Sequence, residues 1–127
     1  MNTTNLPWVG ADEAMSRLRS GMRVFIGSGC AAPQTLIAAL TTRAPYVYDV
    51  EVLHILTHGP APYARTDLLA HLRQNSFFIG GNVRGAVNDG VADYTPMFLS
   101  EIPRLFREKR MHQIGRASCR ERVLASV

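Results

Sequence analysis

The sequence has few cysteines, and this scarcity limits the sites that it could build. Its 127 residues include only two, Cys30 and Cys119. Two cysteines cannot form the multi-cysteine frameworks of disulfide-stapled domains or zinc ribbons. The four histidines also show none of the spacings at which zinc ligands recur. We therefore predict no metal site.

Long apolar runs are missing as well. Hydrophobic residues make up 46% of the chain, but no run approaches the roughly 20 residues that span a bilayer. Residues 1–8 have neither the basic start nor the apolar core of a signal peptide. These absences predict no membrane partner and a cytoplasmic location. The length is that of one domain or part of one.

The sequence of the last fourteen residues indicates an origin different from that of the rest. Residues 114–123 read IGRASCRERV, which matches the in-frame translation of a widely used sequencing-library adapter. We therefore interpret residues 1–113 as a truncated N-terminal domain and residues 114–127 as a non-native read-through tail, excluded from fold reasoning. The alternative is a solvated basic tail. Without the tail Cys30 is alone, which excludes an internal disulfide.

A concentrated positive charge is also absent. The whole chain has a formal net charge of +4, but residues 1–113 hold 11 basic and 9 acidic groups and a net of +2. Residues 107–110 form only a short run of mixed sign, at the end of an expected helix. Nucleic-acid binding needs clustered Lys and Arg, so we predict no nucleic-acid partner.

The stretch from residue 22 to residue 40 has the strongest local pattern. A short apolar strand over residues 23–26 leads into a glycine loop over residues 27–32, and a helix begins at Pro33. Glycines let a backbone approach a ligand, and a helix N-terminus offers unpaired N–H groups. Any tight turn between a strand and a helix also needs glycine, so a ligand loop and a structural turn both remain open.

The same pattern occurs again later in the chain. Phe25-Ile26-Gly27 and Phe78-Ile79-Gly80 end two apolar segments, and each is followed by another glycine and an expected helix. Both loops would lie at the carboxyl ends of parallel strands. Open α/β sheets bind their ligands at that edge.

The remaining segments predict an α/β fold. The prolines in residues 57–63 indicate a loop, and helical patterns alternate with strands without a hairpin signal. We expect a partial parallel sheet of about three clear strands flanked by helices, which breaks off where a further strand should follow. The expected helices cover residues 11–19, 66–73, 84–88 and 100–107, and the later strands cover residues 50–56 and 76–79, with an extended segment at 91–94.

One motif formally fits a dinucleotide fingerprint. Gly27, Gly29 and Ala32 have the spacing, and Asp49 or Glu51 follows about 20 residues on. The acidic residue of that motif belongs at the carboxyl end of the second strand, whereas these two precede or open it. A Rossmann-like nucleotide-binding domain of an oxidoreductase is therefore the alternative hypothesis.

Nucleophilic catalysis has one candidate residue. Cys30 lies beside an expected helix N-terminus, which lowers the pKa of a thiol. His54 and His58 are the candidate bases, although a strand or loop histidine with a backbone partner is the favoured interpretation of each. We expect His71 on the exposed side of a helix. Asp89 and Asp93 flank Gly90 and are interpreted as turn and cap residues rather than a carboxylate pair.

Several segments together resemble the N-terminal part of the acetyl-CoA hydrolase/transferase family, which includes 4-hydroxybutyrate and succinate CoA-transferases. The resemblance covers about residues 9–110 and is most specific at Tyr94-Thr95-Pro96 with the segment that follows. Met22 departs from it, because the family often has an acidic residue there. The matching segments are residues 20–30, 50–63, 77–82, 92–96 and 99–106.

The resemblance implies the N-terminal part of a two-domain CoA-transferase-type α/β enzyme that is several times longer and homo-oligomeric. Such enzymes transfer CoA between an acyl-CoA and a small carboxylate through a glutamyl-CoA thioester, or pass the acyl group to water. Coenzyme A is then a substrate, with no bound cofactor. The glutamate belongs to the second half, so we expect no catalytic residue in this chain and no activity from it.

The resemblance also implies which residues contribute to the site. They would act as backbone-donor loops that face the acyl or CoA part of the substrate. A non-catalytic sugar-phosphate-binding module of similar topology is the third hypothesis. The residues carried over are Gly27, Ser28, Gly29, Pro33, Gly80, Gly81 and Asn82.

Overall fold

A four-stranded parallel sheet organises the computed structural model, which describes residues 9–108, 116–117 and 123–124. Its strands follow the order β1-β2-β3-β4, and all three pairings are parallel. The predicted parallel α/β class is therefore confirmed. The strands are β1 (Arg23–Ile26), β2 (Val50–His54), β3 (Leu72–Ser76) and β4 (Asp93–Tyr94).

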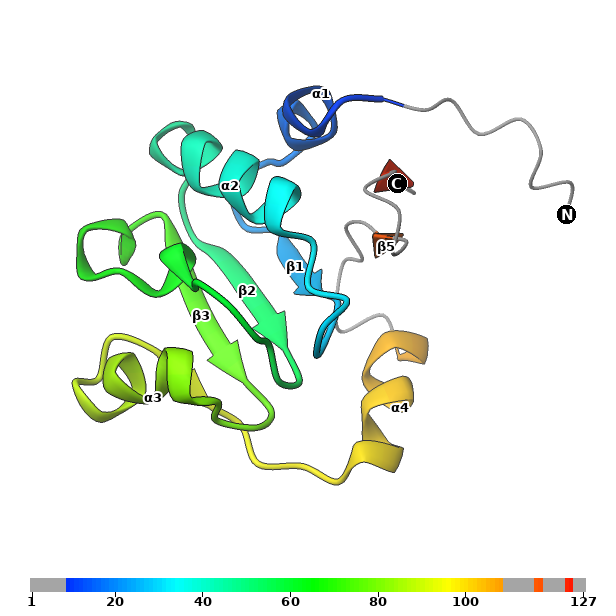
Figure 1. Cartoon of the computed structure of the whole chain (residues 1–127), viewed down its shortest axis with the longest axis vertical. Coiled ribbons are helices and arrows are strands. Elements are labelled where there is room, and N and C mark those ends of the chain that lie inside the picture. The colour runs from blue at the N-terminus through cyan, green and yellow to red at the C-terminus, as the bar shows by residue number, and fades with distance from the viewer. Residues whose placement is uncertain (1–8, 109–115, 118–122, 125–127) are drawn as a thin grey trace, which may run out of the picture.

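In the part of the chain that the structure describes, four α-helices and four 3₁₀ segments accompany the strands, and α1 precedes the first of them (Figure 1). Among the described residues, no helix has both the length and the apolar composition needed to cross a membrane. The helices are α1 (Ala11–Ser16), α2 (Gln34–Arg43), α3 (Gly81–Asn88) and α4 (Ile102–Arg107), and the 3₁₀ segments are Ala44–Tyr46, Pro62–Ala64, Thr66–Leu68 and Leu99–Glu101. Two short strands near the C-terminus, β5 (Arg116–Ala117) and β6 (Val123–Leu124), pair antiparallel with each other.

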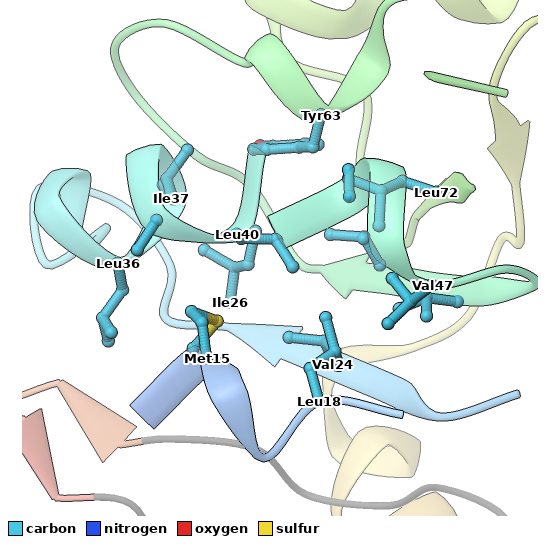
Figure 2. Close-up of a cluster of buried hydrophobic side chains, with 14 of the residues drawn as sticks. Met15, Leu18, Val24, Ile26, Leu36, Ile37, Leu40, Val47, Tyr63 and Leu72 are labelled. Atoms are coloured by element: carbon cyan, nitrogen blue, oxygen red, sulfur yellow. The ribbon is translucent and has the colours of Figure 1, made fainter. Parts of the chain in front are cut away.

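The main core lies between one face of the sheet and the helices α1 and α2. Strand side chains alternate between faces, so Val24, Ile26, Val50 and Val52 all point to this side. Figure 2 shows Met15 of α1, Leu18 just after that helix, and Ile37 and Leu40 of α2 gathered around Val24 and Ile26. Hydrophobic burial on this face fixes the register of the first two strands.

The opposite face of the sheet is half apolar and half polar. Leu53 and Phe77 pack against Ile102 of α4. Toward the amino ends of the strands, the side chains of Arg23 and Glu51 form an ion pair at 2.7 Å, with 46% and 31% of these side chains exposed. The polar contacts continue across the sheet from Asn75 Nδ2 to Glu51 Oε1 at 3.0 Å and from Thr95 Oγ1 to Asn75 Oδ1 at 2.9 Å.

The helix predicted over residues 66–73 is wrong. A single 3₁₀ turn covers Thr66–Leu68, and β3 begins at Leu72, four residues before the predicted strand. The spacing of three leucines in this segment imitates a helix face. The true strand was hidden because Gln74 and Ser76, both inward-facing and buried, break its hydrophobic alternation.

Other boundaries differ in smaller ways. His71 lies in the turn before β3 instead of on a helix, and its Nδ1 is 2.8 Å from the carbonyl oxygen of Val47. The first helix ends at Ser16 instead of residue 19, and the short third helix begins at Gly81 instead of residue 84. Pro33 is the residue that caps α2 and is not part of its first turn.

Candidate functional site

The two glycine loops flank the same segment of chain, residues 56–59, which continues from β2. On one side, the Gly29 N–H donates to the Leu56 carbonyl at 2.6 Å, and Gly29 pairs with Thr57 in an isolated parallel bridge. On the other side, Gly80 packs against Leu56 and Thr57. Figure 1 shows β1, β2 and β3 pointing toward this end of the sheet. The predicted placement of both loops at one edge is confirmed.

Two of these glycines are required for different reasons. Gly29 has a φ of 64°, in the left-handed region that side chains with a Cβ disfavour. Gly80 has an ordinary φ of −79°, but a Cβ there would lie 2.8 Å from Asn82 Oδ1 and 3.0 Å from Leu56 Cδ1. A Cβ on Gly81, by contrast, would meet nothing within 4 Å. The first position needs glycine for backbone conformation and the second for space.

The helices α2 and α3 begin beside the same segment. Pro33 precedes α2 and Gly80 precedes α3, and the first N–H groups of a helix have no partner within it. Gln34 Nε2 donates to the His58 carbonyl at 3.3 Å, which connects α2 to the central segment. Backbone donors therefore lie on both sides of residues 56–59.

Side chains join the central segment to α3. Asn82 Nδ2 donates to Thr57 Oγ1 and to the Gly59 carbonyl, each at 3.0 Å. The Thr57 and Tyr63 hydroxyls lie 3.1 Å apart within hydrogen-bond reach, and both residues are buried. No sequence pattern predicts a role for Thr57 or Tyr63, because these contacts bring together segments up to 25 residues apart that share no local motif.

A buried polar cluster lies below this network. His54 Nε2 is 2.9 Å from Gln74 Nε2, which also donates to Ser76 Oγ at 2.5 Å. The rings of His54 and Tyr63 meet edge-on, with 5.8 Å between their centroids. Burial lowers the pKa of His54 to about 4, so its ring is neutral at neutral pH. The buried atoms His54 Nδ1 and Gln74 Oε1 have no hydrogen-bond partner.

The structure does not assemble a cysteine-histidine pair. Cys30 is exposed in the first glycine loop, whereas His54 is fully buried beside Gln74. His58 is exposed, and its carbonyl is bound by Gln34. Among the hydrogen bonds of residues 9–108, none joins Cys30 to a histidine.

Carboxylates are absent from the loops at this edge. Residues 27–33, 56–59 and 80–82 contain no Asp or Glu. Asp93 lies in β4 and forms an ion pair with Arg73, and Asp89 caps the end of α3. Within the described part of the chain, no three His, Cys, Asp or Glu residues are arranged to hold a metal ion. Ser28 Oγ is buried without a hydrogen-bond partner.

The sequence is similar to known CoA transferases. The profile of the acetyl-CoA hydrolase/transferase N-terminal domain matches residues 7–114. The succinyl-CoA:acetate/propanoyl-CoA:succinate CoA transferase of Fasciola hepatica is 45% identical over 102 residues, which are 79% of this chain and 21% of that protein. The 4-hydroxybutyrate coenzyme A transferase of Clostridium kluyveri is 37% identical over 103 residues, 81% of this chain and 24% of that protein.

Solved structures show the same fold. RipA from Yersinia pestis matches with a TM-score of 0.65 and 26% identity, and a mutant of RipA matches with 0.69 and 25%. Each match covers 80% of this chain and 26% of the RipA chain. The chain thus spans about a quarter or less of these relatives, and nothing in the comparisons supports the nucleotide-binding or sugar-phosphate alternatives. The chain belongs to the acetyl-CoA hydrolase/transferase family, whose N-terminal domain it matches over most of its length.

Proposed function

We propose that this chain forms one wall of the substrate site in an acyl-CoA:carboxylate CoA-transferase, with hydrolysis as the outcome when water replaces the acceptor. The observation that carries the proposal is the convergence of the loops 27–29 and 80–82 on residues 56–59 at the carboxyl edge of the sheet. The CoA-transferase names of the relatives supply the substrate class, an acyl-CoA and a small carboxylate.

The chemistry explains why such a wall is useful. A glutamate carboxylate attacks the thioester carbonyl and CoA leaves as a thiolate, which gives a mixed anhydride. The thiolate then attacks the glutamyl carbonyl and the acyl carboxylate leaves, so that a glutamyl-CoA thioester remains. Each addition places negative charge on an oxygen atom, and fixed backbone N–H groups stabilise that charge. The loops of this chain offer such donors.

The nucleophile itself is proposed to lie outside this chain. No carboxylate occurs in the three segments at the edge, and Glu51, near the opposite, amino end of β2, is engaged by Arg23 and Asn75. The proposed roles of Ser28 and Pro33 follow from their place in the first loop and at the start of α2. A cytoplasmic location and a homo-oligomeric whole protein stay predictions.

The foreign origin of residues 114–127 is also a proposal. The match to the family ends at residue 114, next to the boundary that the adapter-like sequence indicates. This agreement supports treating residues 1–113 as the family-derived part.

A chimera tests the proposed function. Residues 9–113 would replace the matching segment of the Clostridium kluyveri transferase, and exchange of CoA between acetyl-CoA and a small carboxylate would be followed. We expect turnover by the chimera, none by the 127-residue chain alone, and a CoA adduct on a glutamate of the Clostridium part by mass spectrometry. Glu51→Gln in the chimera is the matched control and should keep its turnover.

Two results would overturn the proposal. One is turnover by the 127-residue chain that a substitution of its own carboxylates abolishes. The other is a folded chimera that neither binds acetyl-CoA nor exchanges CoA.

A further inference from the structure

The Asn82 side chain connects two loops through both of its amide hydrogens. One hydrogen is donated to Thr57 Oγ1 and the other to the Gly59 carbonyl, each at 3.0 Å. An amide nitrogen carries two hydrogens, so this donor has none left for a substrate. The amide nitrogen of the Asn82 side chain therefore binds the protein, whatever the backbone N–H of this residue contacts.

The Gly80-Gly81-Asn82 sequence is built to permit this contact. Asn82 Oδ1 passes so close to Gly80 that a Cβ at that position would lie 2.8 Å from it. The adjacent Gly81 has no such neighbour. The first glycine therefore leaves space for the Asn82 side chain to fold back across the start of α3 toward residues 57–59.

The acceptor Thr57 is itself fixed by burial and by a hydrogen bond. Thr57 and Tyr63 are 3% and 1% exposed, and their hydroxyls are hydrogen-bonded at 3.1 Å. Burial raises the pKa of Tyr63, so its hydroxyl stays protonated and available for this bond at neutral pH. On the opposite side, Gln34 Nε2 contacts the His58 carbonyl from α2. The segment is held from both helices.

We propose that Asn82 is a positioning residue, which fixes residues 57–59 against the start of α3 and so sets the spacing of the two glycine loops around an acyl-CoA. The proposal rests on the proposed function of these loops. It assigns the Asn82 side chain a role distinct from that of a ligand contact. Thr57 is its side-chain acceptor and shares the role.

The experiment uses the 127-residue chain and two readouts. Amide hydrogen exchange of residues 57–59 reports, without any ligand, how firmly Asn82 holds this segment. Titration with acetyl-CoA, followed by amide chemical shifts, gives a Kd. The variants are Asn82→Ala, Thr57→Val, Thr57→Ser and the Asn82→Ala/Thr57→Val pair. Asn88→Ala, at the exposed far end of α3, is the matched control.

We expect Asn82→Ala and Thr57→Val each to accelerate exchange at residues 57–59 and to weaken acetyl-CoA binding roughly tenfold, the effect of losing one or two hydrogen bonds. Thr57→Ser keeps the acceptor and should restore both values, and Asn88→Ala should change neither. The effects of the double variant should be less than additive, because both substitutions remove the bond between Asn82 Nδ2 and Thr57 Oγ1.

The outcomes separate this inference from the proposed function. Unchanged exchange and unchanged Kd in Asn82→Ala, or full additivity with Thr57→Val, would overturn the positioning role while leaving the function intact. If the wild-type chain does not bind acetyl-CoA but Asn82→Ala still accelerates exchange at residues 57–59, the acyl-CoA part of the inference is overturned. Only the positioning of residues 57–59 by Asn82 is then confirmed.

Discussion

The buried histidine of β2 makes the stability of this domain sensitive to mild acid. His54 is fully buried, and burial lowers its pKa from 6.5 to about 4. Below pH 6.5 the unfolded chain binds a proton that the folded chain does not, so the free energy of unfolding falls as the pH decreases. The loss is about 1.4 kcal/mol per pH unit and continues until the folded pKa is reached, for about 3 kcal/mol in total.

Urea unfolding followed by circular dichroism, at pH 7.5, 6.0 and 5.0, measures this loss. At pH 5.0 the wild-type chain should have lost about 2 kcal/mol through His54. His54→Gln removes the titrating group, so its free energy of unfolding should depend less on pH by that amount. His58→Gln, an exposed control, should keep the wild-type slope. Equal slopes in wild type and His54→Gln would refute the reasoning, because carboxylates titrate in both.

Three further predictions concern the fold. Gly29→Ala should lower the free energy of unfolding by about 1–2 kcal/mol, because the φ of 64° disfavours a residue with a Cβ. Gly81→Ala, where a Cβ meets nothing, should change it by no more than about 0.5 kcal/mol. Equal effects of the two substitutions in urea titrations would contradict this prediction. Phe77→Ala should lower the free energy of unfolding by about 3 kcal/mol, and Phe78→Ala, at a neighbour that is 43% exposed, should lower it by under about 1 kcal/mol in the same titrations. The reverse order would count against the packing of Phe77 with Leu53 and Ile102. Deleting residues 114–127 should leave the Tm unchanged within error in calorimetry, and a clear decrease would argue against a foreign tail.

The strands with a regular apolar pattern could be predicted from the sequence. The observed bounds of β1 and the start of β2 at Val50 match the prediction, because branched apolar residues occupy alternate positions in both strands. β3 was misplaced by four residues, since Gln74 and Ser76 occupy its inward positions. Gln74 is stabilised there by His54, a partner 20 residues away, and no local pattern records such a contact.

At the candidate site, too, one part could be predicted from the sequence and another could not. Glycines at the ends of two strands were enough to predict that the two loops meet at one edge, because parallel strands share that edge. The residues that hold the loops together were not predicted. Asn82 donates to Thr57 and to the Gly59 carbonyl, and Thr57 is in turn hydrogen-bonded to Tyr63 of the 3₁₀ turn at Pro62–Ala64. The bonds of Asn82 join segments 23 to 25 residues apart, which no local pattern records.

Mapping acetyl-CoA onto the ¹⁵N-labelled 127-residue chain tests the central claim most directly. The account predicts that acetyl-CoA changes amide chemical shifts mainly at residues 27–29, 57–59 and 80–82. NAD⁺ is the control ligand and should leave the chemical shifts of these residues unchanged. Shifts that are absent, that spread evenly over the domain, or that appear at these loops with NAD⁺ but not with acetyl-CoA would contradict it.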